Sequence, residues 1–164
     1  EKHGEISVEE GVISLSSGKP ATGIRYAGKD FPTMNYEISL EARRTDGRDF
    51  FCGITFPVKN EFCSMIIGGW GGGVVGLSNI DNMAAVENET TGFLDVEDDR
   101  WYQIRLRVTT ESIQAWIDGK EYFSVPTGNH KFGIWWEQEP VRPFGIASWY
   151  TSTQLKNIRI SAPD

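Results

Sequence analysis

Apolar and polar residues alternate along most of this chain, with the two-residue period of strands that bury one face. In residues 101–109, every second residue from Tyr102 to Val108 is apolar, and the residues between them are Gln and Arg. Residues 35–44 repeat the pattern, with Tyr36 as the first residue of the apolar face. No long stretch repeats its apolar positions at the spacing of a helix. The pattern therefore predicts an all-β protein.

Turn residues separate these runs and set the limits of the predicted strands. The last run needs an extra residue at Lys156-Asn157, a β-bulge, to keep its apolar residues on one face. Asp118-Gly119 is the strongest short hairpin signal that a sequence offers. Residues 78–100, with weak strand content at 84–86, and residues 127–143 are expected to be long loops. The strands are expected at residues 6–8, 12–15, 22–26, 35–44, 50–56, 62–67, 74–77, 101–109, 112–117, 120–125, 144–150 and 155–160.

Such a series of strands and hairpins indicates an antiparallel β-sandwich, an architecture that mostly binds or cleaves glycans. The chain has 164 residues, which suits a single domain over residues 1–164 and suffices to bury a core without cross-links. The net charge of −7 argues against a nucleic-acid partner, because a negative surface repels phosphates. No apolar run approaches the length of a membrane helix, so membrane insertion is not expected. A start at Glu1 suits either a mature exported protein or a trimmed chain.

The two cysteines, Cys52 and Cys63, fall on neighbouring predicted strands. A turn centred on Lys59-Asn60 would set Cys63 opposite Phe56 and leave Cys52 about 13 Å away along its strand, too far for a disulfide. A turn centred on Pro57-Val58 would instead set the two cysteines opposite each other. The sequence leaves both a disulfide and two buried free thiols open.

A set of strand and turn motifs gives the chain a family likeness. The motifs are the strand from Asn35 to Glu41, Gly53-Ile54-Thr55-Phe56, Trp101-Tyr102-x-Ile104-x-Leu106-x-Val108, Ile113-x-Ala115-Trp116-Ile117-Asp118-Gly119, Phe144-Gly145-Ile146 and Leu155-x-Asn157-Ile158-x-Ile160. With these motifs, the chain resembles the bacterial 3-keto-disaccharide hydrolase family. The resemblance covers roughly residues 5–161.

The resemblance implies a two-sheet antiparallel jelly roll of the concanavalin A-like lectin and glucanase type. It also implies a saccharide or glycoside ligand and a secreted or periplasmic setting. Usual members carry an Asn-Ser-Gly-Ile-x-x-Arg strand where this chain has residues 51–56, and a Tyr-Glu pair ends their next strand where this chain has residues 62–67. Both departures fall where an active-site cleft is lined. A catalytic domain and a non-catalytic glycan-binding module therefore stand as two hypotheses.

Aromatic side chains supply the candidate sugar-binding residues, because an indole packs well against the C–H face of a sugar ring. Trp70 stands out, since it lies among five glycines in residues 68–73 and nothing there favours a strand. It either forms a ligand platform or folds over the open end of the sandwich. Trp116 is expected on the non-core face of its hairpin, with Phe123 on the same face. The complete set of candidate binding residues is Trp70, Trp135, Trp136, Trp149, Tyr150 and Trp116.

Two glutamates directly after Trp135-Trp136 are the candidate acid and base. Glu137 and Glu139 flank Gln138, and two carboxylates beside two indoles suit a sugar site or, alternatively, an exposed acidic loop. A second pattern, Glu37-x-Ser39-x-Glu41, places two carboxylates on one strand face. It differs from the Glu-x-Asp-x-Glu arrangement of laminarinase-like enzymes because Ser39 replaces the middle acid, and a solvated strand face is the alternative explanation. A 3-keto sugar needs only one base, because the ketone acidifies the neighbouring C–H.

Oxygen-bearing side chains in the first long loop raise the question of a metal. Asn79, Asp81 and Asn82 offer ligands of the kind that Ca²⁺ takes, although they lack the spacing of an EF-hand. Turn chemistry of Asn and Asp explains them equally well. No other cofactor is expected. His3 and His130 are the two histidines, and neither belongs to a recognisable nucleophile motif.

Overall fold

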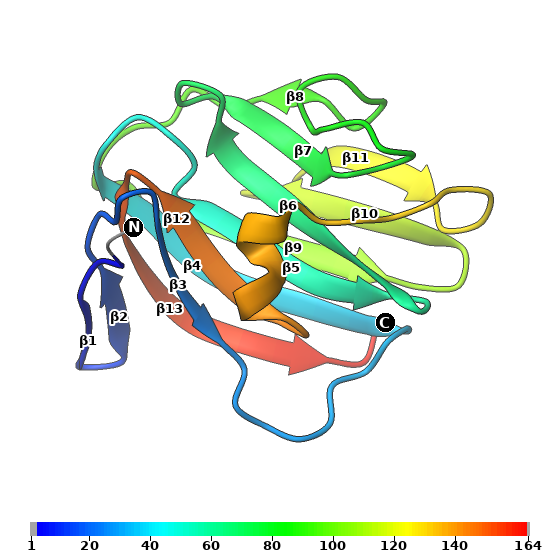
Figure 1. Cartoon of the computed structure of the whole chain (residues 1–164), viewed down its shortest axis with the longest axis horizontal. Coiled ribbons are helices and arrows are strands. Elements are labelled where there is room, and N and C mark those ends of the chain that lie inside the picture. The colour runs from blue at the N-terminus through cyan, green and yellow to red at the C-terminus, as the bar shows by residue number, and fades with distance from the viewer. Residues whose placement is uncertain (1–2, 164) are drawn as a thin grey trace.

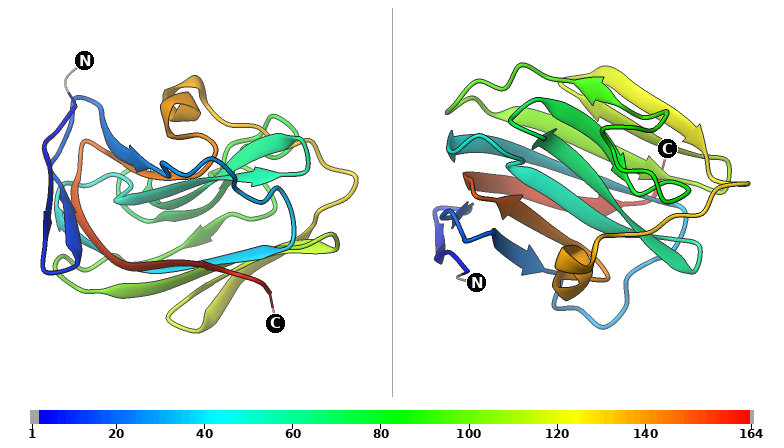
Figure 2. Two further views of the ribbon diagram at one scale, coloured as in Figure 1. Left: turned by 90° about the horizontal axis from the view of Figure 1, so that it is seen from below. Right: turned by 45° about the horizontal axis from the view of Figure 1, so that its top comes forward.

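The computed structural model describes residues 3–163 and consists of two antiparallel sheets packed face to face, as the edge-on view in Figure 2 shows. The seven-stranded sheet has the order β1 (Ile6–Glu9), β2 (Val12–Leu15), β13 (Ser152–Ser161), β4 (Tyr36–Asp46), β9 (Tyr102–Val108), β10 (Ser112–Ile117) and β11 (Lys120–Pro126). The six-stranded sheet has the order β3 (Ala21–Arg25), β12 (Gly145–Trp149), β5 (Cys52–Val58), β6 (Glu61–Gly69), β7 (Val74–Ser78) and β8 (Gly92–Phe93). The predicted antiparallel sandwich is confirmed.

The core lies between the two sheets and is built by the alternation that the sequence shows. In β4, the side chains of Tyr36, Ile38, Leu40 and Ala42 are at most 3% exposed, whereas the residues between them are only partly buried. In β9, Tyr102 begins the same pattern. Because strand side chains point alternately to opposite faces, one apolar face on each strand suffices to fill the space between the sheets.

The six-stranded sheet is covered on its outer face as well. All seven residues of β5 are buried, although only every second one points into the core. The cover consists of the 3₁₀ helix η1 (Trp136–Val141), which crosses β3 and β12, and the loop that follows β7 (Figure 1). This second apolar layer centres on a cluster of Phe50, Ile66, Val74 and Ala85. Burial on both faces explains why β5, β6 and β7 do not alternate in polarity.

Three local features differ from the sequence-based prediction. β6 continues into the glycine-rich segment and ends at Gly69. Residues 84–86 form a turn, and the extra strand of that loop is β8. A bulge between Ala115 and Trp116 sets Phe123 opposite Ala115, so Phe123 packs in the core and the prediction that it shares a face with Trp116 is wrong. The bulge predicted near Lys156 in β13 is confirmed, because the pairing with β4 shifts between Lys156 and Arg159.

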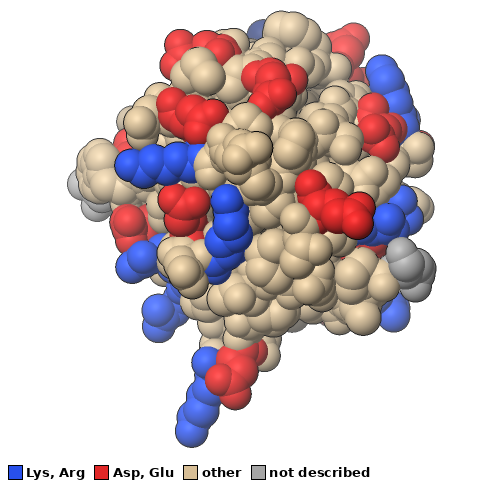
Figure 3. All heavy atoms as spheres, turned by 90° about the vertical axis from the view of Figure 1, so that its right-hand side faces the viewer, with Lys and Arg blue, Asp and Glu red and all other residues tan. Residues whose placement is uncertain are grey.

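The surface charge and the lengths of the helices bear on the sequence-based expectation of no nucleic-acid partner and no membrane insertion. On the side of the molecule that Figure 3 shows, Lys and Arg side chains are interspersed with Asp and Glu, so neither sign of charge forms a continuous stripe there. Within residues 3–163, no helix is long and apolar enough to cross a membrane.

The register of β5 against β6 answers the question of the cysteines. Val58 pairs with Glu61 across the turn, so Cys63 lies opposite Phe56 and Cys52 lies opposite Ile67. Both cysteines are free and have no exposed surface. Burial raises the pKa of both thiols well above its ordinary value, because a thiolate there would lose its hydration.

We therefore expect both thiols to be inert in the folded protein. The thiolate is the reactive form, and both its formation and reagent access require unfolding. Titration with a disulfide reagent should detect no thiol under native conditions and both thiols in denaturant. Rapid reaction of either cysteine in the native protein would contradict this burial.

Candidate functional site

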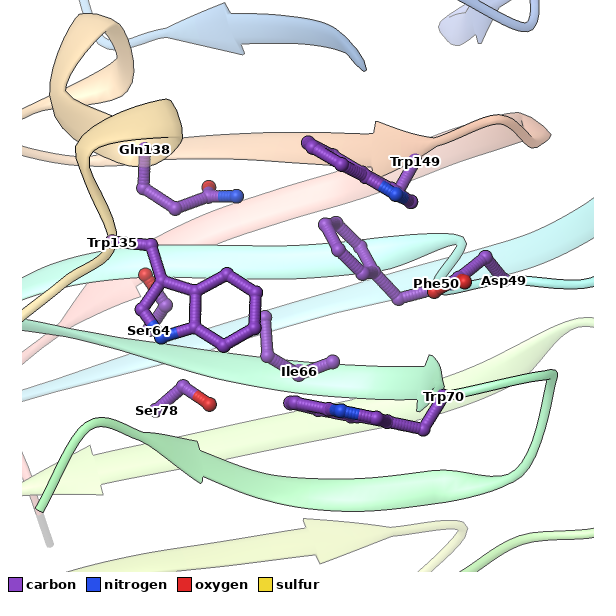
Figure 4. Close-up of a pocket in the computed structure, with 9 residues that line it drawn as sticks. All are labelled: Asp49, Phe50, Ser64, Ile66, Trp70, Ser78, Trp135, Gln138 and Trp149. Atoms are coloured by element: carbon purple, nitrogen blue, oxygen red, sulfur yellow. The ribbon is translucent and has the colours of Figure 1, made fainter. Parts of the chain in front are cut away.

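A cavity of about 150 Å³ opens on the outer face of the six-stranded sheet, between η1 and the turn that joins β6 to β7. Three indoles surround it, and Phe50 fills the space between two of them (Figure 4). We call it the aromatic cavity. The residues that line it are Asp49, Phe50, Ser64, Ile66, Trp70, Ser78, Trp135, Gln138 and Trp149.

The glycine-rich turn after β6 places Trp70 at the rim of this cavity. Gly72 and Gly73 both donate their N–H groups to the Gly69 carbonyl, at 3.2 Å. The turn requires positive φ values of 91° at Gly71 and 124° at Gly72, which glycine adopts without a steric penalty. The Trp70 side chain is left 38% exposed, with its ring centroid 5.7 Å from that of Trp135 and the two rings at 82°.

Trp135 is held by the loop that follows β7. Its indole Nε1–H donates to Oδ1 of Asn79 at 2.8 Å. The backbones of Asn79 and Gly133 exchange two hydrogen bonds, of 2.6 and 3.1 Å, and Ile80 bridges to Phe132. Two loops that are far apart in the sequence thus form one wall.

Trp149 forms the opposite wall at the end of β12. It stacks on Phe50, with centroids 6.1 Å apart and an angle of 24° between the rings. Tyr150 packs its edge against Trp149 at 5.9 Å and is 54% exposed. Tyr150 therefore contacts the indole but does not line the cavity itself.

Gln138 contributes a polar group to the aromatic cavity. It is only 4% exposed, and its Oε1 accepts a hydrogen bond from Thr55 Oγ1 at 3.3 Å. The Thr55 hydroxyl is in turn 2.7 Å from the hydroxyl of Ser64. Figure 4 shows the amide nitrogen of Gln138 directed into the space between Trp135 and Trp149. A held amide of this kind can donate a hydrogen bond to a ligand oxygen.

Asp49 is the one ionisable residue among those that line the aromatic cavity. It lies between Trp70 and Trp149 at the edge of the cavity (Figure 4), and its Oδ1 accepts a hydrogen bond of 2.8 Å from the Phe50 N–H. Partial burial raises the pKa of this carboxyl above its ordinary value, although the N–H groups of Phe50, Gly71 and Trp70 act in the opposite direction. A carboxyl with a raised pKa can exchange a proton with a ligand.

Sequence reasoning missed both Asp49 and Gln138. Asp49 follows Asp46-Gly47-Arg48 and resembles an ordinary turn residue, while Gln138 stands between two more conspicuous glutamates. The one available signal for Asp49 was its position in the short loop before the buried strand β5, since loop residues at strand ends often carry function.

Glu137 and Glu139, the acid and base candidates from the sequence, do not line the aromatic cavity. Glu139 forms an ion pair with Arg142 at 2.8 Å. Glu137 and Trp136 line a neighbouring hollow of about 510 Å³ on the other side of η1, against β3 and β12. Trp149 lines both spaces, so the two adjoin at that indole. Trp136 is 70% exposed.

Trp116 lies on the outer face of the seven-stranded sheet, on the opposite side of the sandwich from the other candidates. Its ring faces the guanidinium groups of Arg105 at 4.1 Å and Arg107 at 5.2 Å. The structure therefore does not bring Trp116 together with Trp70, Trp135 and Trp149.

The residues predicted as calcium ligands bind other parts of the protein. Asn79 accepts from Trp135, and the carboxylate of Asp81 contacts the Lys131 N–H and His130 Nδ1, both at 2.7 Å. The backbone N–H and His130 lower the pKa of Asp81. Asn82 is a turn residue with a φ of 66°. Within residues 3–163, no three His, Cys, Asp or Glu side chains form a cluster able to hold a metal ion, so the calcium site stays a prediction.

Comparison with known proteins agrees with the sequence-based resemblance. The family model described as the 3-keto-alpha-glucoside-1,2-lyase-like domain matches residues 2–161. No curated protein matches the chain in sequence.

Solved structures with the same fold come from proteins that handle glycans. The carbohydrate binding module CBM66 from Bacillus subtilis superimposes with a TM-score of 0.62 at 9% identity, covering 98% of this chain and 92% of its own. Domain 4 of AbnA, an extracellular arabinanase from Geobacillus stearothermophilus in complex with arabinotriose, gives a TM-score of 0.59 at 14% identity and covers 97% and 76%. The exoplasmic domain of VIP36, bound to Ca²⁺ and Man3GlcNAc, gives 0.62 at 9% identity and covers 100% and 84%. These likenesses confirm the predicted jelly roll of the lectin type.

The position of Trp70 predicts a modest role in stability. Trp70→Ala removes a side chain that is 38% exposed, so we expect the free energy of unfolding to fall by about 1–2 kcal/mol. Phe51→Ala, which removes a fully buried ring, should cost about 3–5 kcal/mol. Denaturant unfolding of the two variants measures the difference. Equal losses would show that Trp70 is a core residue.

Proposed function

This chain belongs to the family of 3-keto-alpha-glucoside-1,2-lyase-like domains, and on that premise we propose that the aromatic cavity binds a 3-keto-glycoside and cleaves its glycosidic bond. The observation that carries the proposal is a single carboxylate of raised pKa, Asp49, at the edge of a cavity walled by three indoles. The indoles supply flat apolar faces for a sugar ring, and Gln138 supplies a hydrogen-bond donor.

The chemistry of a 3-keto sugar explains why one carboxylate suffices. The ketone at C3 acidifies the C–H bond at C2, and a base removes that proton. The electron pair of the C2–H bond forms a C1–C2 double bond, the C1–O bond breaks, and the departing oxygen takes up a proton. Addition of water to the double bond then yields the free 3-keto sugar. A retaining glycosidase would instead need two carboxylates about 5 Å apart.

In this proposal Asp49 removes the C2 proton. The amide nitrogen of Gln138 binds the C3 ketone oxygen, on which negative charge develops. Gln138 suits that role because its other amide atom is fixed by Thr55. Glu137 and Glu139 remain as the alternative acid and base. Glu137 would act from the neighbouring hollow beside Trp149.

Asp49→Asn should abolish the release of sugar from a 3-keto-disaccharide while leaving substrate binding largely intact. The variant should melt no lower than wild type, because burial disfavours the charged carboxylate that the substitution removes. In the wild type the carboxylate form is active. Turnover should therefore fall with decreasing pH through a pKa above the ordinary value of 3.8 for this carboxyl.

Glu137→Gln and Glu139→Gln serve as the matched controls, since each also removes one carboxylate near the cavity. Full turnover in Asp49→Asn, combined with its loss in Glu137→Gln, would transfer the role of the base to Glu137. The reaction is followed as released sugar across a pH series.

A second candidate function is non-catalytic glycan binding. It is favoured by the absence of a second carboxylate among the cavity residues, and by the same fold in the module CBM66, which is described as carbohydrate binding. Under this alternative the aromatic cavity holds a saccharide that leaves unchanged.

Trp70→Ala should weaken saccharide binding by about 1–3 kcal/mol, the scale of one lost aromatic contact in a binding site. Trp101→Ala is the control. Trp101 packs against the side chains of Arg43 and Lys156 and does not line the aromatic cavity. Calorimetry with 3-keto and ordinary disaccharides measures both variants. Tight binding of ordinary saccharides without turnover would favour the binding module, and equal binding by the Trp70 variant and wild type would refute the proposed site.

We also propose that the protein works in a secreted or periplasmic setting, where polymeric glycans are met. Ca²⁺ would be an optional ligand near Asn79, Asp81 and Asn82. Repeating the calorimetric titration with added Ca²⁺ and with a chelator decides whether the ion contributes to binding.

A further inference from the structure

A second hollow, of about 440 Å³, lies on the outer face of the seven-stranded sheet. Four of its residues form one row across four adjacent strands. Strand pairing sets Arg159 of β13 beside Ser39 of β4, Ser39 beside Arg105 of β9, and Arg105 beside Trp116 of β10. Since adjacent strands lie about 4.8 Å apart, the Cα atoms of the two arginines are about 10 Å apart, with only a small serine between them.

The acidic residues on either side of Ser39 are already engaged. Glu37 accepts a hydrogen bond from Arg107 at 3.0 Å, and Glu41 accepts one from Asn157 at 2.5 Å. Ser39 itself brings no carboxylate to the row. Because Ser39 stands in place of the middle acid of the Glu37-x-Ser39-x-Glu41 pattern, the position between the two arginines of the row carries no carboxylate.

Both arginines retain hydrogen-bonding capacity. Arg105 Nε is buried and has no hydrogen-bond partner, and its contact with Glu37 is a long one of 3.9 Å. Within residues 3–163, Arg159 takes part in no ion pair. The Arg105 side chain as a whole is nevertheless 43% exposed, so its terminal N–H groups can bind an anionic ligand.

Trp116 fixes the direction of the Arg105 side chain. The guanidinium lies 4.1 Å from the centroid of the indole, an arrangement that cation–π attraction stabilises. A guanidinium held in this way loses little further freedom when it binds a carboxylate. The indole also gives the hollow an apolar wall. The amides of Gln103 and Asn157 line its polar part together with the Glu41 carboxylate, which is bonded to Asn157.

We propose that this hollow, named here the arginine row, is a second saccharide-binding site that selects a sugar bearing a carboxylate, such as a uronic acid. The carboxylate binds between Arg105 and Arg159 above Ser39, the ring contacts Trp116, and the two amides bind hydroxyl groups. The net charge of −7 disfavours unspecific anion binding, so local geometry has to supply the selectivity. The site faces away from the aromatic cavity and is independent of it.

Titration of isotope-labelled protein with sodium glucuronate tests this site by nuclear magnetic resonance. The Trp116 indole N–H and the Arg105 Nε–H should shift with saturation, and glucose should shift neither. Arg159→Gln should weaken glucuronate binding about tenfold, the effect of one charge-assisted contact. Ser39→Asp should weaken it at least as much, because its carboxylate would occupy the arginines, and it should fold as stably as wild type.

Arg43→Gln is the matched control. It removes a positive charge from the same sheet face, but Arg43 bonds to Gln154 and does not line the hollow, so binding should change less than about twofold. An equal loss in Arg43→Gln and Arg159→Gln would show general charge attraction and overturn the proposal. Sulfate that binds as tightly as glucuronate would reduce the site to an anion site only, and equal shifts with glucose would also refute it.

Discussion

The pairing of β5 with β6 in one register decides which side chains fill the core and which face the aromatic cavity. The two-residue turn at Lys59-Asn60 pairs Val58 with Glu61, and a shift by one residue would turn every side chain of β6 to the opposite face. In the observed register, Cys63 and Met65 fill the core, while Ser64 and Ile66 face outward. The floor of the aromatic cavity is thus set by the same pairing that fills the sandwich.

Small residues on the outer face of the six-stranded sheet make room for the covering layer. A Cβ atom at Gly76 would lie 3.0 Å from Thr90 Oγ1, and one at Gly53 would lie 2.9 Å from the Phe50 ring. The loop after β7 and the Phe50 side chain can pack this closely only because those positions lack side chains. Since Phe50 supports Trp149, the small residues of the sheet determine where the cavity walls stand.

The sequence allowed the architecture to be predicted because alternation and turn residues are local signals. It failed where distant segments meet. Asp49 and Gln138 come to line one cavity only because η1 and the β6–β7 turn approach the same sheet face. Phe123 was misplaced because one extra residue in β11, Tyr122, inverts the pattern beyond it, and alternation alone cannot show an inserted residue. Trp116 and Trp70 were grouped by residue type, although the two sheets turn them to opposite sides.

Trp149 separates two hollows and contributes to the wall of each. A saccharide long enough to reach both hollows meets the second at a high effective concentration once the first is filled. Under the proposed function, the length of the glycan, as well as the identity of its terminal sugar, thereby becomes a determinant of affinity.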